Sequence, residues 1–160
     1  MTTIAGNVNY KIYLSTATTG AAGSETPTGD IVYFWAEDYD KSVGNLVKPK
    51  DSIDQSIYIP SSKYSIAITL KNCVIVPQGA VTSIAEANAI DHFIYTYSLK
   101  RNAAGMYLFI YSEAESIYRK LSWNTSGTHL QYLKVAIDGW NDIGGKGKVT
   151  TFPSVKFLRG

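Results

Sequence analysis

Hydrophobic and polar residues alternate with a period of two along much of the chain, a pattern typical of strands with one buried face. The longest such run covers residues 64–76, which hold neither Gly nor Pro. Alternate positions from Ile66 to Leu70 are apolar, and the appearance of Cys73 and Ile75 on the opposite side predicts a second half covered on both faces. At about 3.3 Å per residue this strand would span roughly 40 Å, far more than the usual length of about five or six residues. We therefore expect it to project beyond its domain, or to offer an edge to a neighbouring chain.

Shorter strands are expected on both sides of this run. They are predicted at residues 9–14, 31–36, 57–59, 106–111, 117–123, 130–138 and 149–158. Residues 31–36 and 106–111 are apolar at successive positions, which predicts cover on both faces. Residues 15–30 and 37–55 lack the pattern and are expected to be long polar connections, the first of them flexible. Pro153 predicts an edge strand or a bulge near the end of the chain.

One segment has helical periodicity. Ser83 and Glu86 have the spacing of a capping box, in which each side chain satisfies an unpaired backbone donor at the start of a helix. Ile90 and Phe93 follow on one apolar stripe. We expect a helix at about 83–99 that lies on a sheet.

The order of these elements predicts the fold class. The strands follow one another through turns and do not alternate with helices, which argues against a parallel α/β sheet. We expect a mainly β fold, an antiparallel β-sandwich or barrel of about eight strands with one flanking α-helix, in a single domain over residues 1–160.

Composition adds one unusual feature. Charged residues make up only 18% of the chain, and there are 12 Tyr among the 160 residues. Tyr favours interfaces, where its ring contacts apolar groups and its hydroxyl reaches water. One interpretation of the many Tyr residues is therefore a surface that contacts another subunit. The other is simply a β-rich protein, since Tyr also favours strands.

Several functional classes find no support. The net charge is +2, with no clustered basic face for nucleic acid. The start of the chain lacks the pattern of a signal peptide, and no apolar run is long enough to span a membrane, so we expect folding in a cytoplasm. Cys73 is the one cysteine of the chain, so an internal disulfide is excluded, and we expect it to be a small buried hydrophobic residue.

No pattern in the sequence predicts catalysis, a cofactor or a metal site. His92 and His129 lack metal-ligand spacing, and Asp38 with Asp40 lacks the spacing of a calcium loop. Residues 143–148, IGGKGK, resemble a phosphate loop only superficially, because a strand follows where that motif needs a helix. We therefore expect the chain not to be an enzyme.

Three tryptophans leave a second function open. Trp35, Trp123 and Trp140, together with the Tyr residues, could form a platform for sugar rings, which would make the chain a carbohydrate-binding or receptor-binding β-sandwich module. Trp35 lies in an apolar run and is expected in the core. Trp140 lies in a turn-like DGWND sequence and is the best candidate for an exposed aromatic.

Three stretches together carry a resemblance to a known family. They are the long strand YSIAITLKNCVIV, the helix SIAEANAIDHFIYTYSLK and the closing run LQYLKVAIDGWNDIGGKGKVTTFPSVKFLRG. In this order they resemble the tail-tube (major tail) proteins of tailed phages and viruses and of related injection machines. Proteins of that family have a β-sandwich or barrel with one flanking helix. A long hairpin or loop and the termini reach neighbouring subunits, and six-fold rings stack into a hollow tube.

The resemblance implies a structural virion protein that assembles with itself in the host cytoplasm. The implied partners are other copies of the chain, further virion tail proteins, and DNA that passes through the lumen without sequence-specific binding. One departure is the net charge of +2, since the family often lines its lumen with acidic residues. The residues expected at the subunit interface are Ile66, Ile68, Leu70, Trp140 and Phe157.

Overall fold

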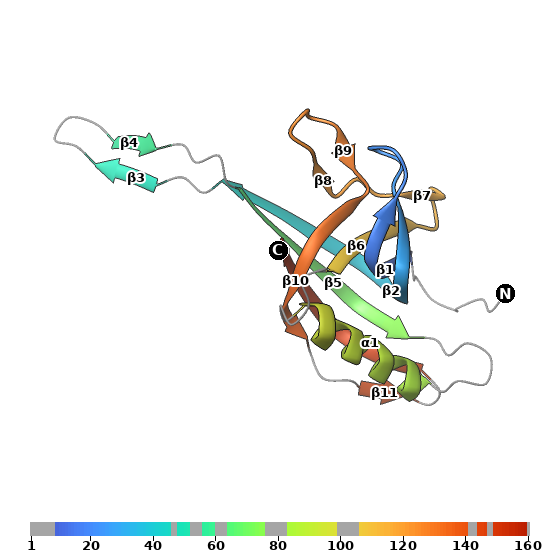
Figure 1. The fold of residues 1–160 in the computed structure, drawn as a ribbon. Coiled ribbons are helices and arrows are strands. Elements are labelled where there is room, and N and C mark those ends of the chain that lie inside the picture. The colour runs from blue at the N-terminus through green and yellow to red at the C-terminus, as the bar shows by residue number, and fades with distance from the viewer. Residues whose placement is uncertain are drawn as a thin grey trace.

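The computed structural model describes residues 9–45, 48–51, 56–59, 64–75, 83–98, 106–140, 144–146 and 149–159. It shows a β-rich body with one helix and a long hairpin that projects from it (Figure 1). The helix is α1 (Ser83–Ser98). The strands are β1 (Tyr10–Thr19), β2 (Thr26–Asn45), β3 (Lys48–Asp51), β4 (Ser56–Ile59), β5 (Tyr64–Ile75), β6 (Met106–Ser112), β7 (Ile117–Tyr118), β8 (Ser122–Trp123), β9 (His129–Leu130), β10 (Tyr132–Trp140), β11 (Gly144–Lys146) and β12 (Val149–Arg159).

Strand pairing closes the main sheet into a barrel. The strands follow the order β1-β2-β5-β12-β10-β6, and β6 pairs back to β1, all in antiparallel ladders. Tyr13 of β1, for example, pairs with Tyr33 of β2 on one side and with Phe109 of β6 on the other. Closure removes most of the exposed edges that an open sheet would carry. The predicted fold class, a mainly β antiparallel architecture with one helix, is confirmed.

The longest predicted strand is central to the barrel. Ile68 of β5 pairs with Lys41 of β2 and with Phe157 of β12. The expectation that this strand offers an edge to a neighbouring chain is therefore wrong, because its own chain occupies both sides over most of its length. A strand that lies between two neighbours and over a core needs an apolar inner face, and this is the pattern seen in the sequence.

The phase of alternation along β5 changes at one residue. Asn72 has a φ of 52°, and Lys71 and Asn72 are both exposed, so that Cys73 becomes the next inward position. Asn tolerates this left-handed conformation better than most residues. Its Nδ2 donates a hydrogen bond to Glu37 Oε2 at 2.9 Å. The second half of the strand therefore has one buried face in a shifted phase, and the prediction of cover on both faces is wrong.

Pro153 lies at the same irregularity. Phe152 pairs with Cys73 and Ser154 with Lys71, which places Pro153 opposite Asn72. A residue without an N–H is tolerated where the ladder is interrupted. β12 as a whole is not the edge strand that was predicted as one alternative, because it lies between β5 and β10, although its ladder with β10 ends at Val155, two residues after Pro153.

Both predicted long connections are largely strand. Within residues 15–30, β1 continues to Thr19 and β2 begins at Thr26, with Ala17 paired to Thr28. Gly20 and Gly23 supply the positive φ values in the turn, 110° and 91°. The strand ends of this hairpin hold small Thr and Ala residues and pair across a register shift between Ser15 and Ala17, without the large apolar residues that a periodicity search detects. Within residues 37–55, β2 runs on to Asn45 and β3 follows.

The region 117–123 is not one strand. It forms the short β7 and β8, separated by three residues, and Ile117 is 53% exposed. A hairpin turn joins β8 to β9, with Gly127 at a φ of 80°.

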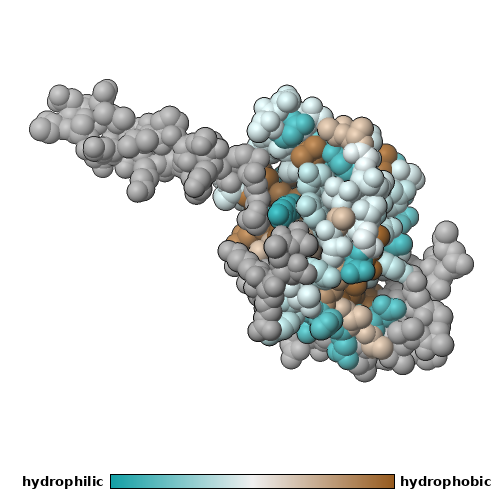
Figure 2. Space-filling model, viewed as in Figure 1, coloured by the Kyte–Doolittle hydropathy of each residue, from teal (hydrophilic) through white to brown (hydrophobic). Residues whose placement is uncertain are grey.

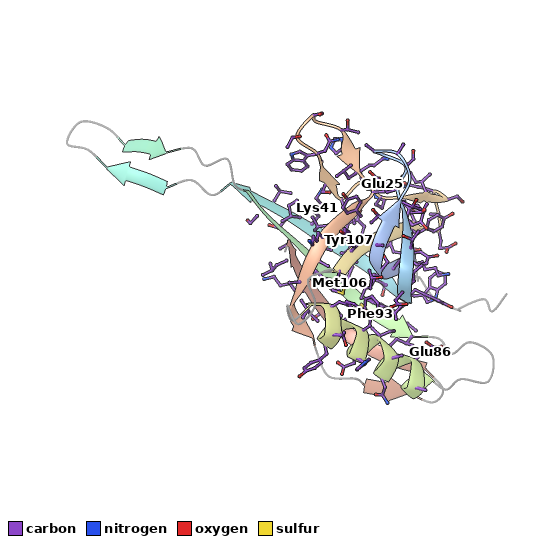
Figure 3. All side chains as sticks on the ribbon, in the orientation of Figure 1. Glu25, Lys41, Glu86, Phe93, Met106 and Tyr107 are labelled. Atoms are coloured by element: carbon purple, nitrogen blue, oxygen red, sulfur yellow. The ribbon has the colours of Figure 1, made fainter. Side chains whose placement is uncertain are left out.

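One apolar core fills the barrel. It combines inward side chains of the six barrel strands with the buried face of α1, and includes Ile12, Phe34, Ile68, Leu108, Val135 and Phe157. Ala87, Ile90, Phe93 and Ile94 of α1 are all buried in it. Figure 3 shows Phe93 of the helix and Met106 of β6 in this region, and both belong to the same cluster. The predicted helix is confirmed and ends at Ser98.

Candidate interaction surfaces

The first candidate surface is an arm formed by β2, β3, β4 and β5. β2 and β5 remain paired as far as Asn45 and Tyr64, whereas the pairing of β2 with β1 extends only as far as Ala36. The ribbon therefore leaves the barrel, and β3 and β4 extend away from it (Figure 1). Among the residues that the structure describes, β3 and β4 pair only with each other.

The base of the arm exposes apolar surface. Val43 of β2 is 47% exposed although it pairs with the buried Ile66. Figure 2 shows hydrophobic side chains on the visible face near the point where the arm leaves the body. An isolated two-stranded hairpin is only marginally stable in water, so the arm gains most from a partner that packs against it.

The second candidate surface is an outward face of the barrel that is rich in aromatic rings. Its rows follow from the register: Trp35, Lys11 and Tyr111 are neighbours across β2, β1 and β6, and Tyr33, Tyr13 and Phe109 form the next row. We call it the aromatic face. Its outward positions are Ile31, Tyr33 and Trp35 of β2, Lys11, Tyr13 and Ser15 of β1, Tyr107, Phe109 and Tyr111 of β6, Tyr118 of β7, and Tyr132 and Lys134 of β10.

The rings of this face pack against one another. Phe109 is fully buried although it points away from the core cluster, because Tyr118 and Tyr132 lie over it, with ring centroids at 5.8 and 6.0 Å. Tyr111 and Tyr118 meet edge to face at 5.1 Å. Burial raises the pKa of Tyr118 and Tyr132. These phenols therefore stay neutral at physiological pH and keep a hydroxyl that can both donate and accept.

Lys11 lies within the aromatic face. Its Nζ is 4.2 Å from the ring centroid of Tyr33, 5.1 Å from that of Tyr13 and 5.5 Å from that of Trp35. These are distances at which a cation is attracted to a ring face. The ion pairs found among the described residues, Lys71–Asp40 and Arg119–Glu115, do not include Lys11.

The position of Trp35 shows that the prediction of a core residue is wrong. It is half-buried on the outward face beside Lys11 and is not a member of the core cluster. The apolar run 31–36 misled the prediction because it fills both faces of a strand, with Phe34 and Ala36 inward and Ile31, at 42% exposure, outward.

A third feature is a buried carboxylate that joins two distant segments. Glu25, only 4% exposed, accepts hydrogen bonds from the Gly23 N–H at 2.9 Å and from the Gln131 N–H at 3.0 Å. The Gln131 Nε2 donates to the Glu25 carbonyl at 2.7 Å, and Lys120 Nζ donates to the Gly23 carbonyl. Figure 3 shows Glu25 at the turn between β1 and β2, beside the β8–β9 hairpin. These hydrogen bonds hold the β1–β2 turn against Lys120 and Gln131, which lie on either side of the β8–β9 hairpin.

Glu25 predicts an acid-dependent loss of stability. Burial raises the pKa of its carboxyl, but the backbone N–H groups of Gln131 and Gly23 and the charge of Lys120 outweigh burial, and the net shift is downward. A lowered pKa stabilises the fold above the ordinary Glu value of about 4.3, and this contribution is lost as the pH falls through the folded pKa. We expect Glu25→Gln to lower the free energy of unfolding by roughly 1–3 kcal/mol at pH 7, because one buried N–H loses its acceptor.

The measurement is urea unfolding of both proteins between pH 7 and pH 3. The difference between wild type and Glu25→Gln should shrink at the acid end. Glu115→Gln, at a half-exposed side chain paired with Arg119, serves as the control. A difference that does not change with pH would mean that the Glu25 charge does not matter.

The acidic residues considered for calcium lie on an exposed part of β2. Asp40 Oδ2 is 2.6 Å from Lys71 Nζ, and Asp38 Oδ1 accepts from the Tyr39 N–H at 2.8 Å. Within the described ranges no group of three or more His, Cys, Asp or Glu residues could hold a metal ion. Glu37, Asp38 and Asp40 instead form an acidic strip, the name used below, along the strand as it leaves the barrel.

Four of the five residues predicted for the subunit interface lie in the core. Ile66, Ile68, Leu70 and Phe157 are at most 1% exposed and belong to the core. Their side chains are therefore not available to a second subunit. Trp140 pairs with Val155 at the end of β10, and its side chain lies outside the described residues.

Cys73 has the environment of an inert buried thiol. Burial raises its pKa to about 12, so the reactive thiolate is scarce at neutral pH. We expect a thiol reagent at pH 7.5 to label the native protein at least about a hundredfold more slowly than the protein in 6 M guanidinium. A free cysteine peptide gives the reference rate, and equal rates in both states would contradict the buried position.

No family model matches the chain, and no curated protein matches its sequence. In the part of the chain that the structure describes, no helix has both the length and the apolar character needed to cross a membrane.

Proposed function

We propose that this chain is a structural protein that assembles with copies of itself into stacked rings around a channel, as the tail-tube subunits of tailed phages and viruses do. In that role it passes a genome through the lumen, performs no catalysis, and functions in the virion. The observation that carries the proposal is the arm, a hairpin that continues well beyond the barrel and whose described outer strands pair only with each other (Figure 1).

The arm is the strongest support because its length has no use within one barrel. β2 and β5 stay paired as far as Asn45 and Tyr64, beyond the last pairing of β2 with β1 at Ala36 and of β5 with β12 at Ala67, and β3 and β4 extend farther still. Ordering such a ribbon costs conformational entropy that contacts must offset, and a second subunit can supply those contacts. The arm and its receiving surface lie on different parts of the chain, so the contact is heterologous and repeats until a ring closes or a filament grows.

The aromatic face gives independent support. It gathers eight rings on one outward surface. Phe109 is buried beneath its neighbours, and the other seven are half-buried: Tyr13, Tyr33, Trp35, Tyr107, Tyr111, Tyr118 and Tyr132. Such an aromatic surface is typical of subunit contacts.

Electron microscopy tests the proposal directly. Negative-stain images of the purified full chain, taken across a range of concentrations, should show rings or tubes of even width, and sedimentation velocity should show mass that grows with concentration. A monomer at every concentration would contradict the proposal.

The aromatic face also supports a second candidate, a carbohydrate-binding module. Trp35, Tyr33 and Tyr13 present rings on which sugars could stack, beside the cation Lys11. In that case a glycan should shift tryptophan fluorescence saturably in a monomeric protein. The shift should disappear in Trp35→Ala and persist in Trp123→Ala, whose ring lies by Lys41 and His129.

A further inference from the structure

We propose that the aromatic face binds the acidic strip of a second copy of this chain, with Lys11 of one copy against Asp38 of the next. The inference rests on the proposed function, and it names the two surfaces that make the contact between subunits.

The two outward sides of the barrel differ in composition. The side formed by β5 and β12 carries mostly small or charged residues at its outward positions: Ser65, Ala67, Thr69, Lys71, Ser154, Lys156 and Leu158. Subunit contacts are depleted in Ser, Ala and Lys and enriched in Tyr and Trp. The aromatic face is therefore the side that can supply the aromatic part of a subunit contact, and the β5–β12 side, which adjoins the acidic strip, can supply the polar part.

The aromatic face is best buried against an anion. Its charged outward positions are Lys11 and Lys134, both cationic. Burial raises the pKa of Tyr33 and of Tyr13, and the negative charges of Glu86 and Glu113, which lie outside these positions, help to raise the first and the second respectively. Covering Lys11 with apolar protein would remove water from its ammonium and leave the ring faces of Tyr13, Tyr33 and Trp35 as its partners, without a counter-charge. A surface that brings a carboxylate to Lys11 removes that cost and is the best match.

The acidic strip supplies that carboxylate. Within the strip, the Glu37 carboxylate accepts a hydrogen bond from Asn72, and Asp40 forms an ion pair with Lys71. Asp38 is exposed, and its carboxylate accepts a hydrogen bond from the neighbouring Tyr39 N–H. It lies opposite Lys71 in the ladder. Asp40 raises the pKa of that ammonium and the charge of Asp38 adds to the shift, but the carboxylate that is ion-paired with Lys71 is that of Asp40. Asp38 is the member of the strip best placed to pair with a cation of another copy.

The sizes of the surfaces are consistent with a shared contact. Four neighbouring strands at about 4.8 Å spacing, three outward positions deep, cover roughly 200–350 Å². A stable contact buries about 800 Å² per partner. The aromatic face is therefore one part of a larger contact, to which the ribbon that carries the strip also contributes.

Charge exchange on the full chain tests this pairing. Lys11→Glu and Asp38→Lys should each raise the concentration needed for assembly by about tenfold or more, which corresponds to ~1.4 kcal/mol. A mixture of the two variants should recover assembly, because the carboxylate introduced in one variant then meets the ammonium introduced in the other. The double variant should recover it too. Asp91→Lys, a charge reversal at an exposed position of α1 outside both surfaces, is the matched control and should assemble like the wild type.

The outcomes separate this inference from the proposed function. A wild-type chain that never assembles overturns both. Wild-type assembly that Lys11→Glu leaves unchanged, or a mixture that fails to recover, overturns the pairing and leaves the structural function standing. Circular dichroism checks the fold of every variant. If Lys11→Glu does not fold, Lys11→Gln replaces it, and added salt should then weaken assembly of the wild type more than that of Lys11→Gln.

Discussion

Ile68→Lys is expected to unfold the barrel, with a loss of about 4 kcal/mol or more in the free energy of unfolding. Ile68 is fully buried in the middle of β5, between Lys41 of β2 and Phe157 of β12. A lysine there would lose the apolar contacts and place an ammonium among the apolar side chains of the core. Urea unfolding monitored by circular dichroism gives the measurement, and we expect little or no folded protein.

Thr69→Lys is the matched control for this substitution. Thr69 is the next residue of the same strand, and its side chain is half-buried on the outward side opposite Asp40. We expect a loss of about 1 kcal/mol or less, within the range of strand propensities. A folded Ile68→Lys protein that only failed to assemble would show that Ile68 is a contact residue and that the inward position is wrong.

Replacing residues 46–63 by Asn-Gly is expected to abolish assembly and leave the barrel intact. Asn45 and Tyr64 are directly paired, so a two-residue turn can join them without a change of register, and Asn-Gly suits such a turn. The melting temperature should stay within about 3 °C of the wild-type value, because the ladders that close the barrel lie outside the deleted segment. Sedimentation velocity and negative-stain images would then show monomers.

A smaller replacement provides the control for the arm. Joining Asp51 to Ser56, which are also paired, by Asn-Gly in place of residues 52–55 keeps β3 and β4. We expect assembly to persist. If the chain without residues 46–63 still forms rings or tubes, the arm is not what holds the subunits together, and the aromatic face becomes the principal contact.

The candidate surfaces were harder to predict than the elements that carry them. The abundance of Tyr suggested a contact surface, but the individual residues of the aromatic face are scattered from Lys11 to Lys134 along the chain. Glu25 looked like part of a flexible loop, and its partner Gln131 lies 106 positions away. The residues predicted for the interface were apolar residues of prominent strands. Most of them are core residues, because apolar residues that alternate along a strand usually face the core of their own chain.

What the sequence determined by itself is local. Periodicity identified the run that became β5, helix α1 was placed to within one residue, and the strands separated by turns predicted the mainly β class. These features depend on neighbours within a few positions, such as Ile90 and Phe93 on one buried stripe of α1, so the sequence displays them directly.

The tertiary structure alone decided which side of each strand is buried and which strands meet. Alternation shows that a strand has two faces, but the return of β6 to β1 and the left-handed Asn72 set which face points inward. The arm and the aromatic face are consequences of those pairings. Strand register is fixed by contacts across long separations in sequence, and a shift of one residue exchanges the two faces.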